Sequence, residues 1–355
     1  MLKGNKGEWS EIYTLLKLLG DGNLHSGNAD LKKIKTLVYP IIKIIRTELD
    51  KDFEYILNKN FVIVTGDNNE VTISLKRFQE YTKLLLNKIK SSEKGTFFIP
   101  EIEIFLDDIK CKSLKAKSSV KTDIKIIIHD LKTNTQPLLG FSIKSQLGRP
   151  STLLNASKST NFIYELSANL NNEQINEINN TKKFVEKFNK LSQNNINLSF
   201  VNTEKLIFKN NLVLIDSLLP EIVAHLLILS SKSNKTTIFD LTKQLNQLNP
   251  LKYDLQYNHN FYEYKIKHLL TDIALGLMPA KVWRGTYDTT GGYLVVKKSG
   301  EILAYHIYNK NEFEDYLFEN TRLIRASTTR HEFGKIYTQK GKQLIKLNLQ
   351  IRFKN

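Results

Sequence analysis

Two short apolar segments separated by a polar turn constrain the fold of this chain more than any other feature. Residues 122–128 and 139–146 are rich in β-branched and apolar residues, and the Thr-Asn-Thr-Gln-Pro stretch at 133–137 is typical of a turn. We therefore predict a β-hairpin. Because its strands are antiparallel, Asp123 at the start of the first strand and Lys144 near the end of the second are expected to meet at one end of the sheet.

An aspartate and a lysine at one sheet end suit a metal-dependent nuclease. The carboxylate would bind a hard cation such as Mg²⁺, and the ammonium would stabilise charge or orient the attacking water. The common pattern of such nucleases has an acid two residues before the lysine, but this chain has Ser142 there. Strand alternation places Ser142, Lys144 and Gln146 on one face, where the Gln146 carbonyl could ligate the metal or orient its water. The structural alternative is a surface cross-strand ion pair, worth under about 1 kcal/mol.

A second carboxylate for the metal must then come from elsewhere in the chain. Glu165 follows the hairpin by about twenty residues and could fold back from a helix. Glu8 and Glu11 are three residues apart, on one face of a helix predicted over residues 8–19. Acids at the start of a helix also complement its dipole, so a purely structural role is open for both.

The charge of the chain indicates a polyanionic partner. The formal net charge is +16, with nine Lys or Arg against two acids in residues 110–150 and fourteen against seven in residues 281–355. A Lys-rich and Asn-rich composition from an AT-biased genome is the alternative explanation. Cys111 is the single cysteine, which excludes an internal disulfide and a cysteine-based zinc site. The first ten residues contain no apolar signal core, and no apolar run is long enough for a membrane helix. We therefore expect a soluble protein of the reducing cytoplasm.

The coarse pattern predicts an α/β protein with a mixed sheet and a β-rich carboxyl-terminal section. We expect three sections: 1–170 with the amino-terminal helices and the hairpin, a helical section at 171–280, and a β-rich section at 281–355. Within them the pattern predicts helices over 8–19, 31–49, 75–89, 184–191, 212–230 and 253–277, and strands over 53–64, 71–75 and 343–353.

Several longer blocks carry a family resemblance. The segment 140–157, GFSIKSQLGRPSTLLNAS, closely resembles the HpaII-type restriction endonucleases, as do residues 283–285, 290–293, 327–334 and 346–353. Residues 4–13 also look like the amino-terminal helix of several type II restriction enzymes. The resemblance implies a restriction-endonuclease-like PD-(D/E)xK fold, with a mixed sheet flanked by helices. It also implies Mg²⁺-dependent cleavage of double-stranded DNA at a short palindrome, which is CCGG in these enzymes, and a companion DNA methyltransferase.

On that resemblance Asp123 is the metal ligand and Lys144 the catalytic lysine, and a later acid such as Glu165 replaces the missing one. A palindromic site predicts a homodimer. The candidate DNA contacts are polar or basic residues of two polar runs, of the carboxyl-terminal section and of the lysines before the hairpin: Arg149, Ser151, Asn155, Lys112, Lys115, Lys117, Lys121, Arg284, Arg325, Arg330, His331 and Gln350. A structure-specific or repair nuclease and a catalytically silent DNA-binding protein are the alternatives.

Overall fold

The chain folds into two units that are interleaved along the sequence. The computed structural model describes residues 1–355 except 49–50, 94, 116–121 and 355. The first unit contains Met1–Ser151 and Tyr287–Tyr316, and the second contains Thr152–Thr286 and Leu317–Lys354. Each unit therefore draws on more than one of the three expected sections, and the expected section 281–355 contributes to both.

A nine-stranded mixed sheet forms the body of the first unit. Its strand order is β1-β12-β11-β7-β6-β2-β3-β4-β5, and β1 also pairs with β2. The strands are β1 (Asn23–Gly27), β2 (Lys33–Glu48), β3 (Lys51–Asn58), β4 (Phe61–Gly66), β5 (Asn69–Ser74), β6 (Ile124–Ile128), β7 (Leu138–Ser145), β11 (Gly292–Val296) and β12 (Ile302–His306). The predicted hairpin is confirmed as β6 and β7, which are antiparallel, whereas β7 and β11 run parallel.

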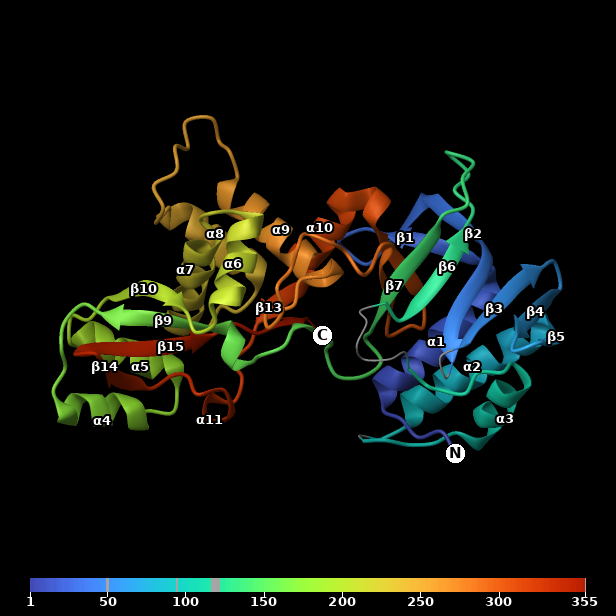
Figure 1. Ribbon diagram of the computed structural model, residues 1–355, viewed down its shortest axis with the longest axis horizontal. Coiled ribbons are helices and arrows are strands. Elements are labelled where there is room, and N and C mark those ends of the chain that lie inside the picture. The colour runs from blue at the N-terminus through green and yellow to red at the C-terminus, as the bar shows by residue number, and fades with distance from the viewer. Residues whose placement is uncertain (49–50, 94, 116–121, 355) are drawn as a thin grey trace. The chain divides into compact units, whose positions relative to one another are not determined.

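The helices α1 (Lys6–Asp21), α2 (Leu75–Ser91) and α3 (Pro100–Asp108) belong to the same unit, as does most of α10 (Lys310–Asn320). The helix predicted over residues 8–19 is confirmed as α1, which begins with a capping box in which the Asn5 side chain accepts from the Glu8 backbone N–H and the Glu8 side chain accepts from the Asn5 N–H. The apolar side of α1, with Trp9, Ile12 and Leu16, is buried in the core shared with the sheet. Figure 1 shows α1 and α2 side by side.

The helix predicted over residues 31–49 is wrong, because this segment is the long strand β2. It is rich in Ile, Val and Thr, whose branched side chains fit a pleated sheet better than a helix. Pro40 also lies in its middle, where it would break a helix. The strand is held between β3 and β6, two partners that a local pattern does not reveal.

The second unit contains a four-stranded sheet and a three-stranded sheet. The larger has the order β10-β9-β15-β14, from β9 (Asn161–Leu166), β10 (Leu198–Thr203), β14 (Ile336–Gln339) and β15 (Lys342–Asn348). The smaller has the order β13-β16-β8, from β8 (Thr152–Leu154), β13 (Thr321–Leu323) and β16 (Ile351–Phe353). The single strand predicted over 343–353 is thus two strands in different sheets.

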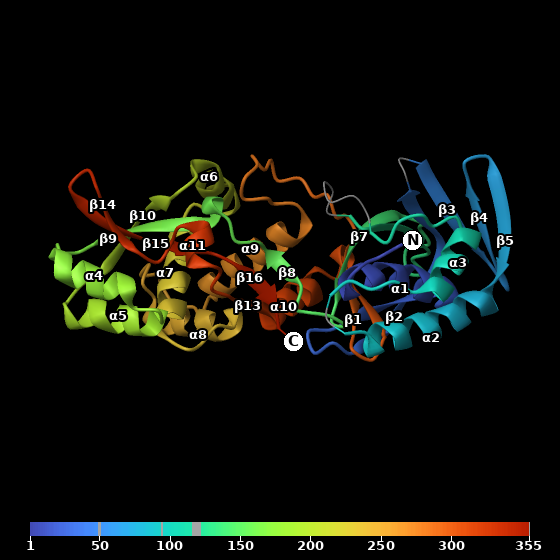
Figure 2. The ribbon, with the colours of Figure 1, turned by 90° about the horizontal axis from the view of Figure 1, so that it is seen from below.

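Helices pack against both sheets of the second unit. They are α4 (Asn172–Asn180), α5 (Phe184–Gln193), α6 (Leu206–Ile215), α7 (Leu219–Lys232), α8 (Ile238–Leu248) and α9 (Phe261–Leu275). The strands of the larger sheet are contacted by α4, α6 and α7, whereas α8 contacts β13 and α9 contacts β8 of the smaller sheet. Figure 2 shows α4, α5 and α7 on one side of the larger sheet. The helices α10 and α11 (Thr328–His331) lie in the section expected to be β-rich. No single helix in the described part of the chain could span a membrane; α6 and α7 would qualify only together, bent by 109° at their break.

Candidate active site

The carboxylate of Asp123 bonds to the backbone of strand β7 at the end of the hairpin. The pairing of β6 with β7 ends at Ile124 and Phe141, and the Asp123 N–H donates to the Phe141 carbonyl at 2.8 Å. Two residues further along β7, the Ile143 N–H donates to Asp123 Oδ2 at 2.6 Å. The end of the hairpin therefore holds a carboxylate on the β6 side of β7. The carbonyl of Ile143 points to the same side, because the N–H and C=O groups of a strand residue face the same neighbour.

Ser142 connects this carboxylate to the lysine. Its hydroxyl donates to Asp123 Oδ2 at 3.1 Å and accepts from Lys144 Nζ at 2.9 Å. The residues lie on one face of β7, as strand alternation predicts. Burial lowers the pKa of Lys144 below its ordinary value, while the charges of Asp123 and Glu11 offset part of that effect. The structure thus brings together Asp123, Ser142 and Lys144.

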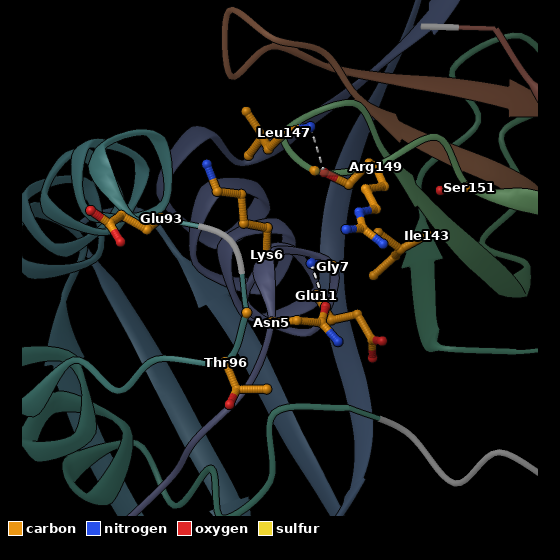
Figure 3. A pocket seen from close by; sticks show the side chains of 13 residues that line it. Asn5, Lys6, Gly7, Glu11, Glu93, Thr96, Ile143, Leu147, Arg149 and Ser151 are labelled. Atoms are coloured by element: carbon orange, nitrogen blue, oxygen red, sulfur yellow. Dashed lines mark hydrogen bonds between the residues drawn. The ribbon is translucent and has the colours of Figure 1, made fainter.

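Glu11 approaches the same sheet end from helix α1. Its charge acts on Lys144, and its side chain lines a pocket of about 750 Å³ together with Ile143, Arg149 and Ser151 (Figure 3). Lys6, in the first turn of the same helix, also lines this pocket. A carboxylate and two cationic side chains from α1 and the segment after β7 therefore surround a space next to the middle residue of the Ser-Ile-Lys triplet.

A pair of serines fixes α1 against the end of β7. The Ser10 and Ser145 hydroxyls lie 2.8 Å apart and share a hydrogen bond, and the Ser10 hydroxyl is also 2.6 Å from the Lys6 carbonyl. Ser10 is fully buried. Because Glu11 is the next residue along the helix, this contact sets the position of its carboxylate relative to the triplet.

The oxygen atoms at this sheet end fit a hard divalent cation. Both hydrogen bonds to the Asp123 carboxylate from described residues end on Oδ2, so Oδ1 has no bond from them. Among the described residues no group of three or more His, Cys, Asp or Glu is arranged to hold a metal ion. Mg²⁺ does not need such a group, since it commonly uses one or two carboxylates together with water and substrate phosphates. Asp123, the Ile143 carbonyl and Glu11 offer that kind of donor set.

Comparison with known proteins decides the family. The family model described as HpaII restriction endonuclease matches residues 5–353. The chain belongs to the HpaII restriction endonuclease family. It is 50% identical over 353 residues to the type II restriction enzyme HpaII of Haemophilus parainfluenzae, covering 99% of this chain and 98% of that protein. No solved structure matches the chain. As a member of the HpaII family, it is a site-specific deoxyribonuclease.

The other two acids considered for the metal have structural partners in this HpaII-family chain. Glu8 closes the capping box of α1 and pairs with Lys115 at 2.8 Å. Burial alone would raise the pKa of the Glu8 carboxyl. The hydrogen bonds from Lys115 and the Asn5 backbone outweigh this effect, so the pKa is lowered overall. The expectation that Glu165 comes from a helix is wrong. Glu165 lies on strand β9 of the second unit, where buried and partly exposed residues alternate from Phe162 onwards, as in a strand. Its carboxylate accepts from Lys342 at 2.8 Å.

The predicted DNA contacts lie in several different environments. Arg149 and Ser151 line the pocket beside the triplet, whereas Asn155, Arg284 and Arg330 are exposed in the second unit. The Arg325 side chain donates to the Ser230 carbonyl at 2.9 Å, and the backbone carbonyl of His331 accepts from Asn161. Gln350 is buried, with 7% of its surface exposed. Lys117 and Lys121 lie outside the described residues, and Lys112 pairs with Asp107.

Three residues of the HpaII-family site escaped the sequence-based prediction. Lys6 and Ser10 both lie in the first turns of α1, and Tyr293 lies on β11 with its ring 4.7 Å from Lys144 Nζ. Gln146 was predicted to ligate the metal or orient its water through its side chain. Its backbone N–H donates to the Val296 carbonyl and so extends the pairing of β7 with β11. The blocks at 4–13 and 290–293 contained these residues, but nothing local in them indicated contact with the hairpin.

Proposed function

We propose that this enzyme hydrolyses double-stranded DNA in a Mg²⁺-dependent reaction at a short palindrome, CCGG, and leaves 5′-phosphate ends. The observation that carries the proposal is the hydrogen-bonded line from Lys144 through Ser142 to Asp123 at the end of the β6–β7 hairpin. Membership of the HpaII restriction endonuclease family supports it. The antiparallel hairpin followed by the parallel strand β11, with α1 packed nearby, also suits a PD-(D/E)xK-type core.

In this proposal each residue of the site has a distinct task. Asp123, the Ile143 carbonyl and Glu11 would hold the metal ion, which supplies Lewis-acid stabilisation of the charge that develops on the scissile phosphate. Glu11 is preferred to Glu165 because its charge acts on Lys144, whereas Glu165 is paired with Lys342. Lys144, with a pKa lowered by burial, orients the attacking water or accepts its proton.

The DNA contacts follow from charge and position. Lys6 and Arg149 lie at the pocket beside Ile143, where they would bind phosphates next to the scissile one. The guanines of a GC-only site present O6 and N7 in the major groove, which arginine reads through two hydrogen bonds. Arg284 and Arg330 are exposed and are proposed for this role, and the buried Gln350 is omitted. A homodimer would match the symmetry of the palindrome, and a cognate methyltransferase would protect the host DNA.

Digestion of a defined plasmid tests the proposal. With Mg²⁺ the purified enzyme should give discrete fragments whose sequenced ends all fall at CCGG and carry 5′-phosphates, and a chelator should stop the reaction. Fragments that end at another palindrome would refute the CCGG assignment. Cuts at branched or damaged DNA rather than at a fixed sequence would indicate a repair nuclease instead.

Substitutions at the site separate catalysis from binding. Asp123→Asn and Lys144→Met should each lower the cleavage rate roughly 100- to 1,000-fold or more, because each removes a charge that stabilises the transition state. Asp123→Asn should still bind the duplex, since it removes a negative charge near phosphates. Lys125→Met is the matched control, because Lys125 is an exposed lysine of the neighbouring strand β6. Equal cleavage by Asp123→Asn and the native enzyme would overturn the assignment.

A further inference from the structure

We propose that Tyr293 is a positioning residue for Lys144, with its buried ring holding the ammonium group in place beside Ser142. The proposal rests on the proposed function, in which Lys144 is the catalytic lysine. Lys144 Nζ lies 4.7 Å from the centre of the Tyr293 ring and 2.9 Å from Ser142 Oγ. A cation at this distance from the face of an aromatic ring is attracted by the negative charge of the π system.

The register of two strands places the ring at this point. β11 runs parallel to β7, with Tyr293 opposite Ser142 and Val295 opposite Lys144. Neighbours in register on adjacent strands project to the same side of a sheet, so Tyr293 shares a face with both Ser142 and Lys144. Burial raises the pKa of the Tyr293 hydroxyl far above the ordinary range, and the charge of Asp123 adds to the effect. The ring therefore lies within the site rather than behind it.

Two glycines allow β11 to begin this close to β7. A Cβ atom on Gly291 would lie 2.8 Å from atoms of the Phe141 ring, which is too close for any other residue without a shift of that ring. Gly292 has a φ of 98°, a conformation that favours glycine. Gly291 and Gly292 thus allow the chain to approach β7 closely enough for the Tyr293 ring to contact Lys144.

The ring itself is held firmly. Tyr293 is 2% exposed and meets Phe313 edge-on, with 5.4 Å between ring centres and 71° between ring planes. Such packing leaves the ring little freedom, so it restricts the flexible four-carbon chain of Lys144. A half-buried ammonium that has lost water gains more from this contact than an exposed one would.

Single-turnover cleavage of a CCGG duplex with Mg²⁺ tests the inference. Tyr293→Leu should lower the cleavage rate constant roughly 10-fold, because the cation–π contact is lost, while the affinity for DNA stays unchanged. Tyr293→Phe keeps the ring and should cleave at the native rate. Tyr293→Met retains most of the buried volume without a ring and should behave like Tyr293→Leu, so it replaces that variant if the latter does not fold.

Tyr55→Leu is the matched control. Tyr55 is a fully buried tyrosine of β3, a strand of the same sheet that β6 and β2 separate from β7. Its loss should lower the thermal stability to a similar degree without changing the cleavage rate of the folded protein. A native rate in both Tyr293→Leu and Tyr293→Met, or equal damage in Tyr293→Phe, would overturn the role of the ring. Lys144→Met that still cleaves would instead refute the proposed function.

Discussion

At the scale of single residues, Ser142 explains how the site differs from the common metal-nuclease pattern. A hydroxyl replaces an acid, so this position contributes no negative charge to a cation. It instead donates to Asp123 and accepts from Lys144, which keeps these two groups apart while linking them. The second negative charge then has to come from another element, and Glu11 on α1 is the acid whose charge reaches Lys144.

We expect Ser142→Ala to lower the cleavage rate roughly 10- to 100-fold, since both hydrogen bonds of this hydroxyl involve a charged group. Ser142→Thr keeps the hydroxyl and should retain most of the activity. Rate constants from rapid mixing under single-turnover conditions check this. A native rate in Ser142→Ala would show that the hydroxyl has no part in placing the lysine.

At the scale of elements, the sequence predicted those helices and strands that local patterns determine. It failed where partners distant in the sequence determine the secondary structure. The hairpin and α1 follow from periodicity and turn residues alone, and the predicted hairpin implied that Asp123 and Lys144 lie at the same end of the sheet. The apolar spacing of the β2 segment fits both a helical and a strand period, and its strand partners are distant in sequence, so the pattern alone predicts a helix there. Glu11 and Tyr293 reach the site through tertiary packing of α1 and β11, which no local pattern reveals.

One element carries a buried ion pair that anchors the segment leading towards the hairpin. Arg46 and Glu48 on β2 are 5% and 1% exposed, with 2.7 Å between Nε and Oε1. Glu48 accepts from the Lys112 N–H and the Ser113 hydroxyl, and Arg46 donates to the Ser113 carbonyl. Burial raises the pKa of the adjacent Cys111 thiol to about 12, so the thiol stays neutral in this cluster.

We expect Glu48→Gln to lower the free energy of unfolding by about 3–5 kcal/mol, because it leaves the Arg46 charge buried without its partner. Glu54→Gln is the control. Glu54 pairs with Lys43 across β2 and β3, but both side chains are partly exposed, so its loss should change the unfolding free energy by under about 1 kcal/mol. Urea denaturation followed by circular dichroism measures both values. Equal effects of the two substitutions would contradict the anchoring role.

At the scale of the whole molecule, the fold class was predictable from the sequence, but the interleaving of the two units was not. An α/β protein with a mixed sheet was predicted and is confirmed. The insertion of β11 and β12 beside β7, from more than 140 positions later in the chain, was not. Contacts so distant in sequence leave no local periodicity, and the block at 290–293 indicated only the family resemblance.

We expect two copies of the chain to bind one duplex that contains a single CCGG, because a symmetric site is most simply read by a symmetric dimer. Light scattering of the complex, with Asp123→Asn to prevent cleavage, gives the number of chains per duplex. A scrambled duplex of equal length should bind more weakly and lose its affinity more steeply with salt. One chain per specific duplex would refute the dimer.

The passage of the chain between the two units has a consequence for engineering. The polypeptide crosses from one unit to the other after Ser151, after Thr286 and after Tyr316. A fragment that stops at Ser151 would lack β11 and β12, which lie between β1 and β7 in the sheet order, and would leave the catalytic strand without its parallel neighbour. Recombining two members of this family at one junction would therefore break both units, and a chimaera that exchanges the second unit intact must be spliced at all three crossings.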